Sequence, residues 1–142
     1  MPSQRASKLR EHLHFLEKIL KSINAVCNDA FGATAASLAE EEFLKGIPHR
    51  DLYRHHKLEY VDTFALLTEE IAGEVSFEQR MESYFYLAAE YALMGKPDKM
   101  NVFVRKIDWK CWDVTKSQDP AVVQAYRELL ARSQELRFLQ AH

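Results

Sequence analysis

The sequence predicts an all-α protein, a single-domain bundle of five or six helices built from antiparallel helical hairpins over residues 1–142. Apolar residues recur at helical spacings of three and four along most of the chain. Each glycine follows such a stretch, where a helix end favours a left-handed residue, and three of the four prolines open the next stretch. The glycines are Gly32, Gly46, Gly73 and Gly95, and the three prolines are Pro48, Pro97 and Pro120.

The first three expected helices cover residues 3–31, 37–45 and 48–72. Apolar residues of the first helix form a heptad seam that suits packing against other helices. The second helix begins with a capping box formed by Ser37 and Glu40. The third carries several aromatic residues on its inner face. The seam of the first helix consists of Ala6, Leu9, Leu13, Leu16, Leu20, Ile23 and Cys27.

The last three expected helices begin near residues 76, 97 and 119. Ser76 and Gln79 form a second capping box, and this helix closes before Gly95. The inner stripe of the next helix extends from Pro97 as far as Cys111. The final helix has an aspartate at its N-cap and a proline at its first position, both favoured there.

The composition is that of an ordinary globular domain, with 47% hydrophobic and 28% charged residues in a chain of 142. The net charge of −2 provides no global field for nucleic acid, and the basic segment 49–57 has no second basic stretch to continue it. No apolar run could cross a bilayer, and no signal peptide is recognisable. The only two cysteines fall in helical patterns and suit a reducing compartment. We expect a cytoplasmic protein without a membrane or nucleic-acid partner.

The fourth and fifth expected helices are apolar on two sides. Tyr86 and Leu93, seven residues apart, lie opposite the inner stripe of the fourth helix. Val102 and Trp109 have the same relation to the fifth, and Trp112 lies on its flank. A second apolar face is either covered by other helices or used for binding, and tryptophan is frequent among residues that dominate binding energy. These five residues are the candidate partner-binding residues.

Residues 84–107 resemble a single tetratricopeptide-type helical hairpin. Met100 departs from that family's pattern, which has a small residue where the two helices touch, and no second copy occurs about 34 residues away. The resemblance implies a packed helix pair and a role in binding a peptide or partner protein in a concave groove. The matching positions are Leu87, Ala88, Tyr91, Gly95, Met100, Val104 and Ile107.

Two pairs of residues match the spacing of metal ligands in helical bundles. Glu11 and His14 match the step of di-iron carboxylate bundles, and His55 and Glu59 match that of hemerythrin-like bundles. Both pairs are expected to point away from the apolar face of their helix. The only histidine after residue 56 is His142, so the later helices lack the further histidines of these patterns. The pattern therefore predicts no metal site and no cofactor.

His12 and His56 are better placed, because each is at the edge of an apolar face. Both fit a partly buried histidine that is satisfied by one hydrogen bond. Both also fit a ligand-binding or pH-sensitive polar group, and the sequence leaves these alternatives open.

No nucleophile elbow, P-loop or glycine-rich phosphate loop is present, which favours a non-enzymatic protein. The leading hypothesis is a protein-interaction module, such as an adaptor, small chaperone or regulatory subunit. It would use the apolar and aromatic face of the fourth and fifth helices to bind a protein partner or to form a homodimer. The alternative is a helical bundle that binds a metal or small ligand through His12 and His56.

Overall fold

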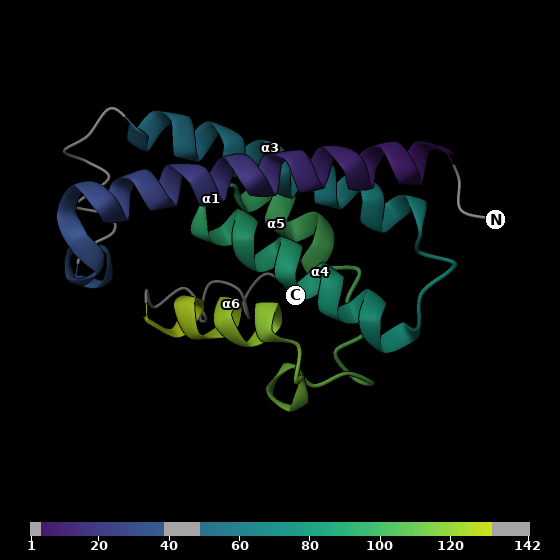
Figure 1. The fold of residues 1–142 in the computed structure, drawn as a ribbon. Coiled ribbons are helices and arrows are strands. Elements are labelled where there is room, and N and C mark those ends of the chain that lie inside the picture. Colours follow the sequence, from purple (N-terminus) through teal and green to yellow (C-terminus); the bar gives the residue numbers. More distant parts are fainter. Residues whose placement is uncertain (1–3, 39–48, 132–142) are drawn as a thin grey trace. The chain divides into compact units, whose positions relative to one another are not determined.

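The computed structural model describes the backbone of residues 4–38 and 49–131, and the side chains of residues 4–22 and 54–131. Within these ranges the protein has five α-helices, one short 3₁₀ helix and no strand, so the predicted all-α fold class is confirmed (Figure 1). The helices are α1 (Gln4–Leu38), α3 (His49–Glu70), α4 (Phe77–Leu93), α5 (Pro97–Val104), η1 (Val114–Lys116) and α6 (Pro120–Ala131).

The chain divides into two compact units, Met1–Phe64 and Ala65–His142. The first unit contains α1 and most of α3, and the second contains the last residues of α3 together with α4, α5, η1 and α6. The boundary lies inside α3, so no linker marks it in the sequence. The expectation of a single domain over residues 1–142 stays a prediction.

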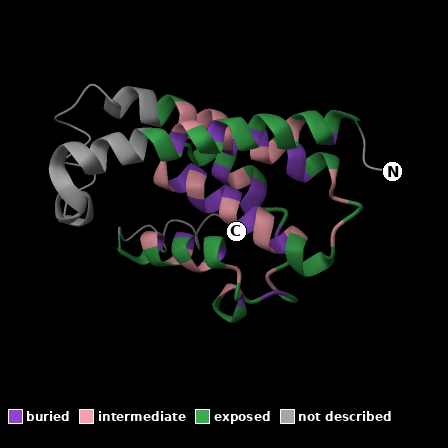
Figure 2. Ribbon diagram, viewed as in Figure 1, coloured by how far each residue is buried: buried purple, intermediate pink, exposed green. Residues whose placement is uncertain are grey.

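The apolar seam predicted for the first helix is buried over the part of α1 whose side chains are described, except for Leu9, which is half-buried (Figure 2). Its spacings of seven, three and four keep the side chains on one face of the helix. Phe15, off this face, is 57% exposed. The buried seam residues are Ala6, Leu13, Leu16 and Leu20.

The predicted end of the first helix was wrong. The helix α1 continues through Gly32 and Ser37 to Leu38, so Gly32 does not terminate it and Ser37 is not an N-cap. A glycine inside a helix costs only about 1 kcal/mol relative to alanine. Four neighbouring alanines, the best helix formers, offset that cost within residues 30–36. The rest of the expected helix 37–45, and both Gly46 and Pro48, lie outside the described residues.

The capping box at the start of α4 is confirmed. The backbone N–H of Gln79 donates to Ser76 Oγ at 3.1 Å, and the N–H of Ser76 donates to Gln79 Oε1 at 3.3 Å. Gly95 ends this region with a φ of 71°, a conformation that favours glycine. Ser76 and Gly95 therefore set the limits of α4 as the sequence predicts.

The helix α4 is the centre of the second unit, and it packs against both α5 and α6. Its aromatic side chains do much of this packing. The ring of Phe85 lies 5.9 Å from that of Trp112 and 6.2 Å from that of Tyr126, measured between centroids. Aromatic contacts of Phe85 therefore join α4 to the segments that follow α5.

The helix α5 is shorter than predicted and ends at Val104 instead of near Cys111. A turn follows, in which Asp108 Oδ1 accepts hydrogen bonds from the backbone N–H groups of Lys110 and Cys111. An aspartate that bonds to the backbone two and three residues later competes with helix formation. This turn explains why the helix ends although the apolar stripe of the sequence continues beyond it.

The predicted start of the last helix is confirmed, because Asp119 Oδ1 accepts the N–H of Ala121 at 2.8 Å and Pro120 is the first residue of α6. None of the helices in residues 4–38 and 49–131 combines the length and the apolar character that crossing a membrane requires.

Candidate metal centre

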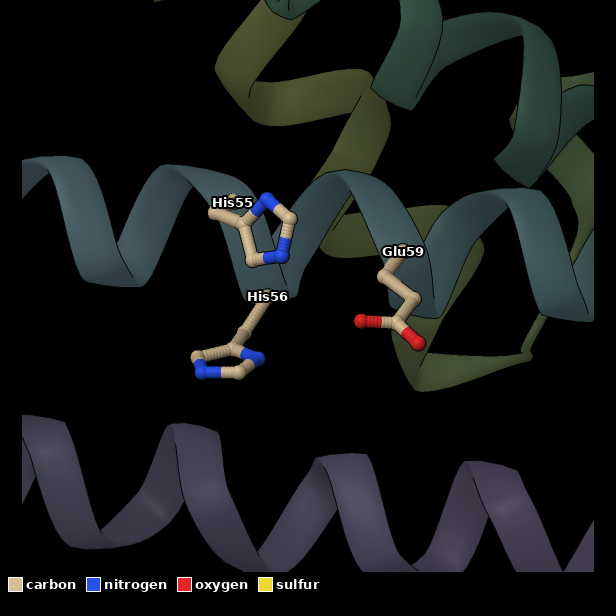
Figure 3. A group of neighbouring side chains, drawn as sticks. All are labelled: His55, His56 and Glu59. Carbon is tan, nitrogen blue, oxygen red and sulfur yellow. The ribbon is translucent and has the colours of Figure 1, made fainter.

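One turn of α3 brings three potential metal ligands together. The ligand atoms of His55, His56 and Glu59 all lie within 4.8 Å of one another (Figure 3). In a helix with 3.6 residues per turn, positions i, i+1 and i+4 fall within an arc of about 100°. The spacing of these residues in the sequence therefore places two imidazoles and one carboxylate side by side without any contribution from a loop.

The group is partly shielded from solvent. His55 is exposed, and His56 and Glu59 are half-buried. The two imidazole rings lie 5.3 Å apart and are inclined at 66°, so they do not stack. The side chains of His56 and Glu59 lie on the side of α3 that faces α1 (Figure 3). A ligand bound by these three side chains would lie beside α3, on the side toward α1, and would be partly exposed to solvent.

His56 has a polar atom whose hydrogen-bonding capacity is not used. Its Nδ1 is buried and has no hydrogen-bond partner. Buried polar atoms are normally satisfied, because leaving one without a partner costs about 1–3 kcal/mol. A bound ion or an ordered water would supply the missing partner, since neutral imidazole is also the commonest metal ligand.

Glu59 accepts a hydrogen bond from a side chain of α1. His12 on α1 donates from Nε2 to Glu59 Oε1 at 2.9 Å, and the two side chains are 43% and 40% exposed. The imidazole is the donor in this pair, because an ionised carboxylate only accepts. The bond leaves the second carboxylate oxygen for another partner.

The three ligand atoms are farther apart than the donor atoms of an occupied zinc site. Donor atoms around a tetrahedral zinc ion with bonds of about 2.0–2.1 Å lie roughly 3.4 Å apart. The separations here reach 4.8 Å at most, so rotation of partly exposed side chains would have to bring them closer by up to about 1.4 Å. Two neutral imidazoles and one carboxylate carry a charge of −1, which favours a cation.

Basic residues nearby act against cation binding. Arg54 precedes the group on α3, and Lys57 lies between its members in the sequence. The ammonium of Lys57 lies over the ring of Tyr60, 5.8 Å from its centroid. We therefore expect the affinity of this group for a divalent ion to be moderate.

The candidate partner-binding residues do not form one exposed face. Val102 is 50% exposed, whereas Tyr86, Leu93 and Trp109 are half-buried. Trp112 is buried, with 8% of its surface exposed, and its ring lies 5.9 Å from that of Phe85. Trp112 therefore belongs to the core of the second unit.

The predicted alignment of Val102 and Trp109 on one helix was wrong. The helix α5 ends at Val104, so Trp109 lies in the following turn. There its Nε1–H donates to the carbonyl oxygen of Val104 at 3.2 Å. Trp109 lies beside Trp112, with ring centroids 6.5 Å apart.

The group of three potential ligands was not predicted from the sequence, because His55 and Glu59 were interpreted as an isolated pair and His56 separately. The signal was the neighbouring His56, which adds a third ligand on the same turn. The contact from His12 depends on how α1 pairs with α3, which the sequence does not specify. Glu11 and His14, the other pair, are exposed and do not join the group.

Comparisons of the chain with protein-family models, with curated proteins and with solved structures found no match. The resemblance of residues 84–107 to a tetratricopeptide hairpin is limited to the packing of α4 against α5 across Gly95.

Proposed function

We propose that this protein binds a divalent transition-metal ion through His55, His56 and Glu59. The observation that supports the proposal is the convergence of their three ligand atoms within 4.8 Å on one turn of α3. The unpartnered Nδ1 of His56 adds to it. This develops the alternative hypothesis of the sequence analysis, with His56 as a ligand.

The donor set selects the class of metal. Imidazole suits zinc, copper, iron and nickel, whereas calcium and magnesium prefer sites made of oxygen atoms. Zinc is the probe of choice because it has no redox chemistry and accepts two histidines and one carboxylate. Three protein ligands leave a coordination position for water or a small ligand, as in zinc sites that are not closed.

Zinc binding to the untagged, chelator-treated protein tests the proposal. Isothermal titration and competition with a chromophoric chelator should give about one equivalent, with a dissociation constant on the order of micromolar. The variants His55→Ala and Glu59→Gln should each weaken binding about tenfold or more, because each removes one of three ligands. Glu59→Gln keeps the side-chain length and a hydrogen-bond acceptor toward His12.

The variant His14→Ala is the matched control, because it removes an exposed histidine of α1 outside the group. It should bind zinc as the unaltered protein does. Absence of stoichiometric binding would contradict the proposal, as would a Glu59→Gln variant with unchanged affinity.

A second candidate function is the interaction module of the sequence analysis, and it is favoured by the exposed apolar side chain of Val102 on α5. Isolated exposed apolar residues are common, so self-association has to be measured directly. If this face mediates self-association, Val102→Glu should convert a concentration-dependent dimer to a monomer in light scattering. If the unaltered protein is a monomer at every concentration, self-association is excluded and only binding to a different protein remains.

We also propose a cytoplasmic location. The free, exposed thiol of Cys111 supports it, because exposed thiols persist in reducing compartments.

A further inference from the structure

The hydrogen bond between His12 and Glu59 joins residues that are 47 positions apart in the sequence and belong to different helices. An ion pair this exposed contributes little to stability on its own, because solvent screens it. Its importance lies in the acceptor, since Glu59 is the only carboxylate among the three converging ligand groups. His12 therefore fixes the one anionic member of the group from the opposite helix.

Ligating carboxylates in metal sites are usually held by hydrogen bonds from residues that do not themselves touch the metal. Such a residue orients the carboxylate and lowers the cost of ordering it when the ion arrives. The carboxylate of Glu59 has two oxygens, and His12 uses Oε1. The other oxygen can bind the ion while the existing hydrogen bond stays in place.

We infer that His12 is a positioning residue of the metal site, which holds Glu59 in its ligating orientation and couples metal occupancy to the pairing of α1 with α3. The inference rests on the proposed function, because it assigns a residue to the same site. All three ligands lie on α3, so a metal bound to them alone would brace only that helix. The bond from His12 extends the effect to α1.

Two substitutions of His12 separate positioning from direct ligation. His12→Gln keeps an N–H donor at the end of the side chain but lacks an imidazole ligand, and His12→Leu removes the donor. We expect His12→Leu to weaken zinc binding about tenfold, at the lower end of the loss typical for such supporting residues. His12→Gln should stay within about threefold of the unaltered protein, because the amide restores the hydrogen bond.

Urea unfolding of the metal-free variants provides a readout of any purely structural role. We expect little change in metal-free stability for either variant, since the pair is exposed on both sides. Zinc should raise the unfolding midpoint less in His12→Leu than in His12→Gln. His14→Leu, an exposed histidine two positions along α1, is the matched control for replacing a histidine by leucine.

The outcomes distinguish this inference from the proposed function. If the unaltered protein takes up no zinc, both are overturned. If it binds zinc and His12→Leu binds equally well, only the role of His12 is overturned. If His12→Gln loses as much affinity as His12→Leu, the imidazole is itself a ligand and the positioning role is rejected. Weak binding by His12→Leu with rescue by His12→Gln supports the inference.

Discussion

The polar side chains of the loop between α5 and α6, in the second unit, have different surroundings from those between α1 and α3, in the first unit. In the second unit, the carboxylates of the loop between α5 and α6 accept hydrogen bonds from nearby backbone or hydroxyl groups. Asp113 accepts both the N–H and the hydroxyl of Thr115, at 3.0 and 2.7 Å, and Asp108 and Asp119 accept backbone N–H groups. In the first unit, Glu59 binds a side chain of another helix, and the buried Nδ1 of His56 has no partner.

The difference indicates where ligand chemistry is available. A carboxylate that caps a turn is held by local hydrogen bonds to the backbone, and it contributes to stability. A half-buried imidazole with an unpartnered nitrogen retains a lone pair or a proton at that atom for a ligand. The second unit also has a buried polar atom without a partner, Asn101 Oδ1 on α5, but the one group of three potential metal ligands found among the described residues contains His56. The candidate site therefore lies in the first unit, and the second has a packed aromatic core.

The largest expected effect comes from breaking the core of the second unit. Phe85→Ala removes a fully buried ring that packs against Trp112 and Tyr126, and we expect it to cost about 3–5 kcal/mol of unfolding free energy. The protein has only two tryptophans, Trp109 and Trp112, and both lie in this unit, so their fluorescence reports its unfolding. The fluorescence midpoint in urea should fall sharply.

Zinc binding provides the contrast for this variant. Under conditions where Phe85→Ala remains folded, its zinc affinity should stay within about twofold of the unaltered protein, because every proposed ligand lies in the first unit. A large loss of affinity in the folded variant would show that the site depends on the core of the second unit.

A smaller effect is expected from removing a satisfied polar group. The Ser117 hydroxyl is buried, donates to Glu82 Oε2 at 2.5 Å and accepts the N–H of Asp119 at 3.3 Å. We expect Ser117→Ala to cost about 1–3 kcal/mol, because it leaves the half-buried carboxylate of Glu82 without this donor. Urea unfolding followed by tryptophan fluorescence should show this loss as a lower midpoint. Ser83→Ala, at a half-buried position of α4, is the matched control and should change stability by less than about 0.5 kcal/mol.

Removing the unpartnered imidazole of His56 in the first unit should change the unfolding free energy in the opposite direction, or leave it unchanged. In the metal-free protein, we expect His56→Leu to leave stability unchanged or raise it by up to about 1 kcal/mol, because the cost of burying Nδ1 without a partner disappears. Helical circular dichroism during urea unfolding measures this change, since no tryptophan lies in the first unit. His55→Leu, at an exposed position, controls for added apolar surface. A clear destabilisation by His56→Leu would mean that the imidazole already supports the fold.

Local signals in the sequence predicted the second unit well and its loop poorly. Ser76, Gly95 and Asp119 act through contacts within a few residues, so pattern and chemistry suffice to place them. The end of α5 was missed because the apolar stripe continues to Cys111, while the turn at Asp108 breaks the helix. Gly32 was misread because helix propensity around it outweighs the cost of one glycine.

The candidate site shows the same limit. The ligands on α3 share one turn, so the sequence contained enough information to group them. The contact between His12 and Glu59 requires the register of α1 against α3, and a heptad seam does not determine which polar residues meet across a helix pair.

The smallest expected effect concerns the reactivity of Cys111. The side chain of Asp108 raises the pKa of this thiol above its ordinary value of 9.0, through hydrogen bonding first and through its negative charge second. Because the thiolate is the reactive species, alkylation of Cys111 should be slow between about pH 7 and 9 and should accelerate as the pH rises. The variant Asp108→Asn removes the charge, so its rate profile should be displaced toward lower pH.

The control for this last prediction uses the second carboxylate of the same loop. Hydrogen bonds from Thr115, its hydroxyl first and its backbone N–H second, lower the pKa of Asp113, so this carboxylate already serves its own turn. Asp113→Asn should therefore leave the profile of Cys111 unchanged. The experiment requires a Cys27→Ser host, so that a single thiol reacts. Superimposable profiles for Asp108→Asn and the host would mean that Asp108 orders the backbone of the turn without controlling the thiol. The carboxylate of Asp108 would then act only as a hydrogen-bond acceptor for the backbone, as Asp113 and Asp119 do in the same loop.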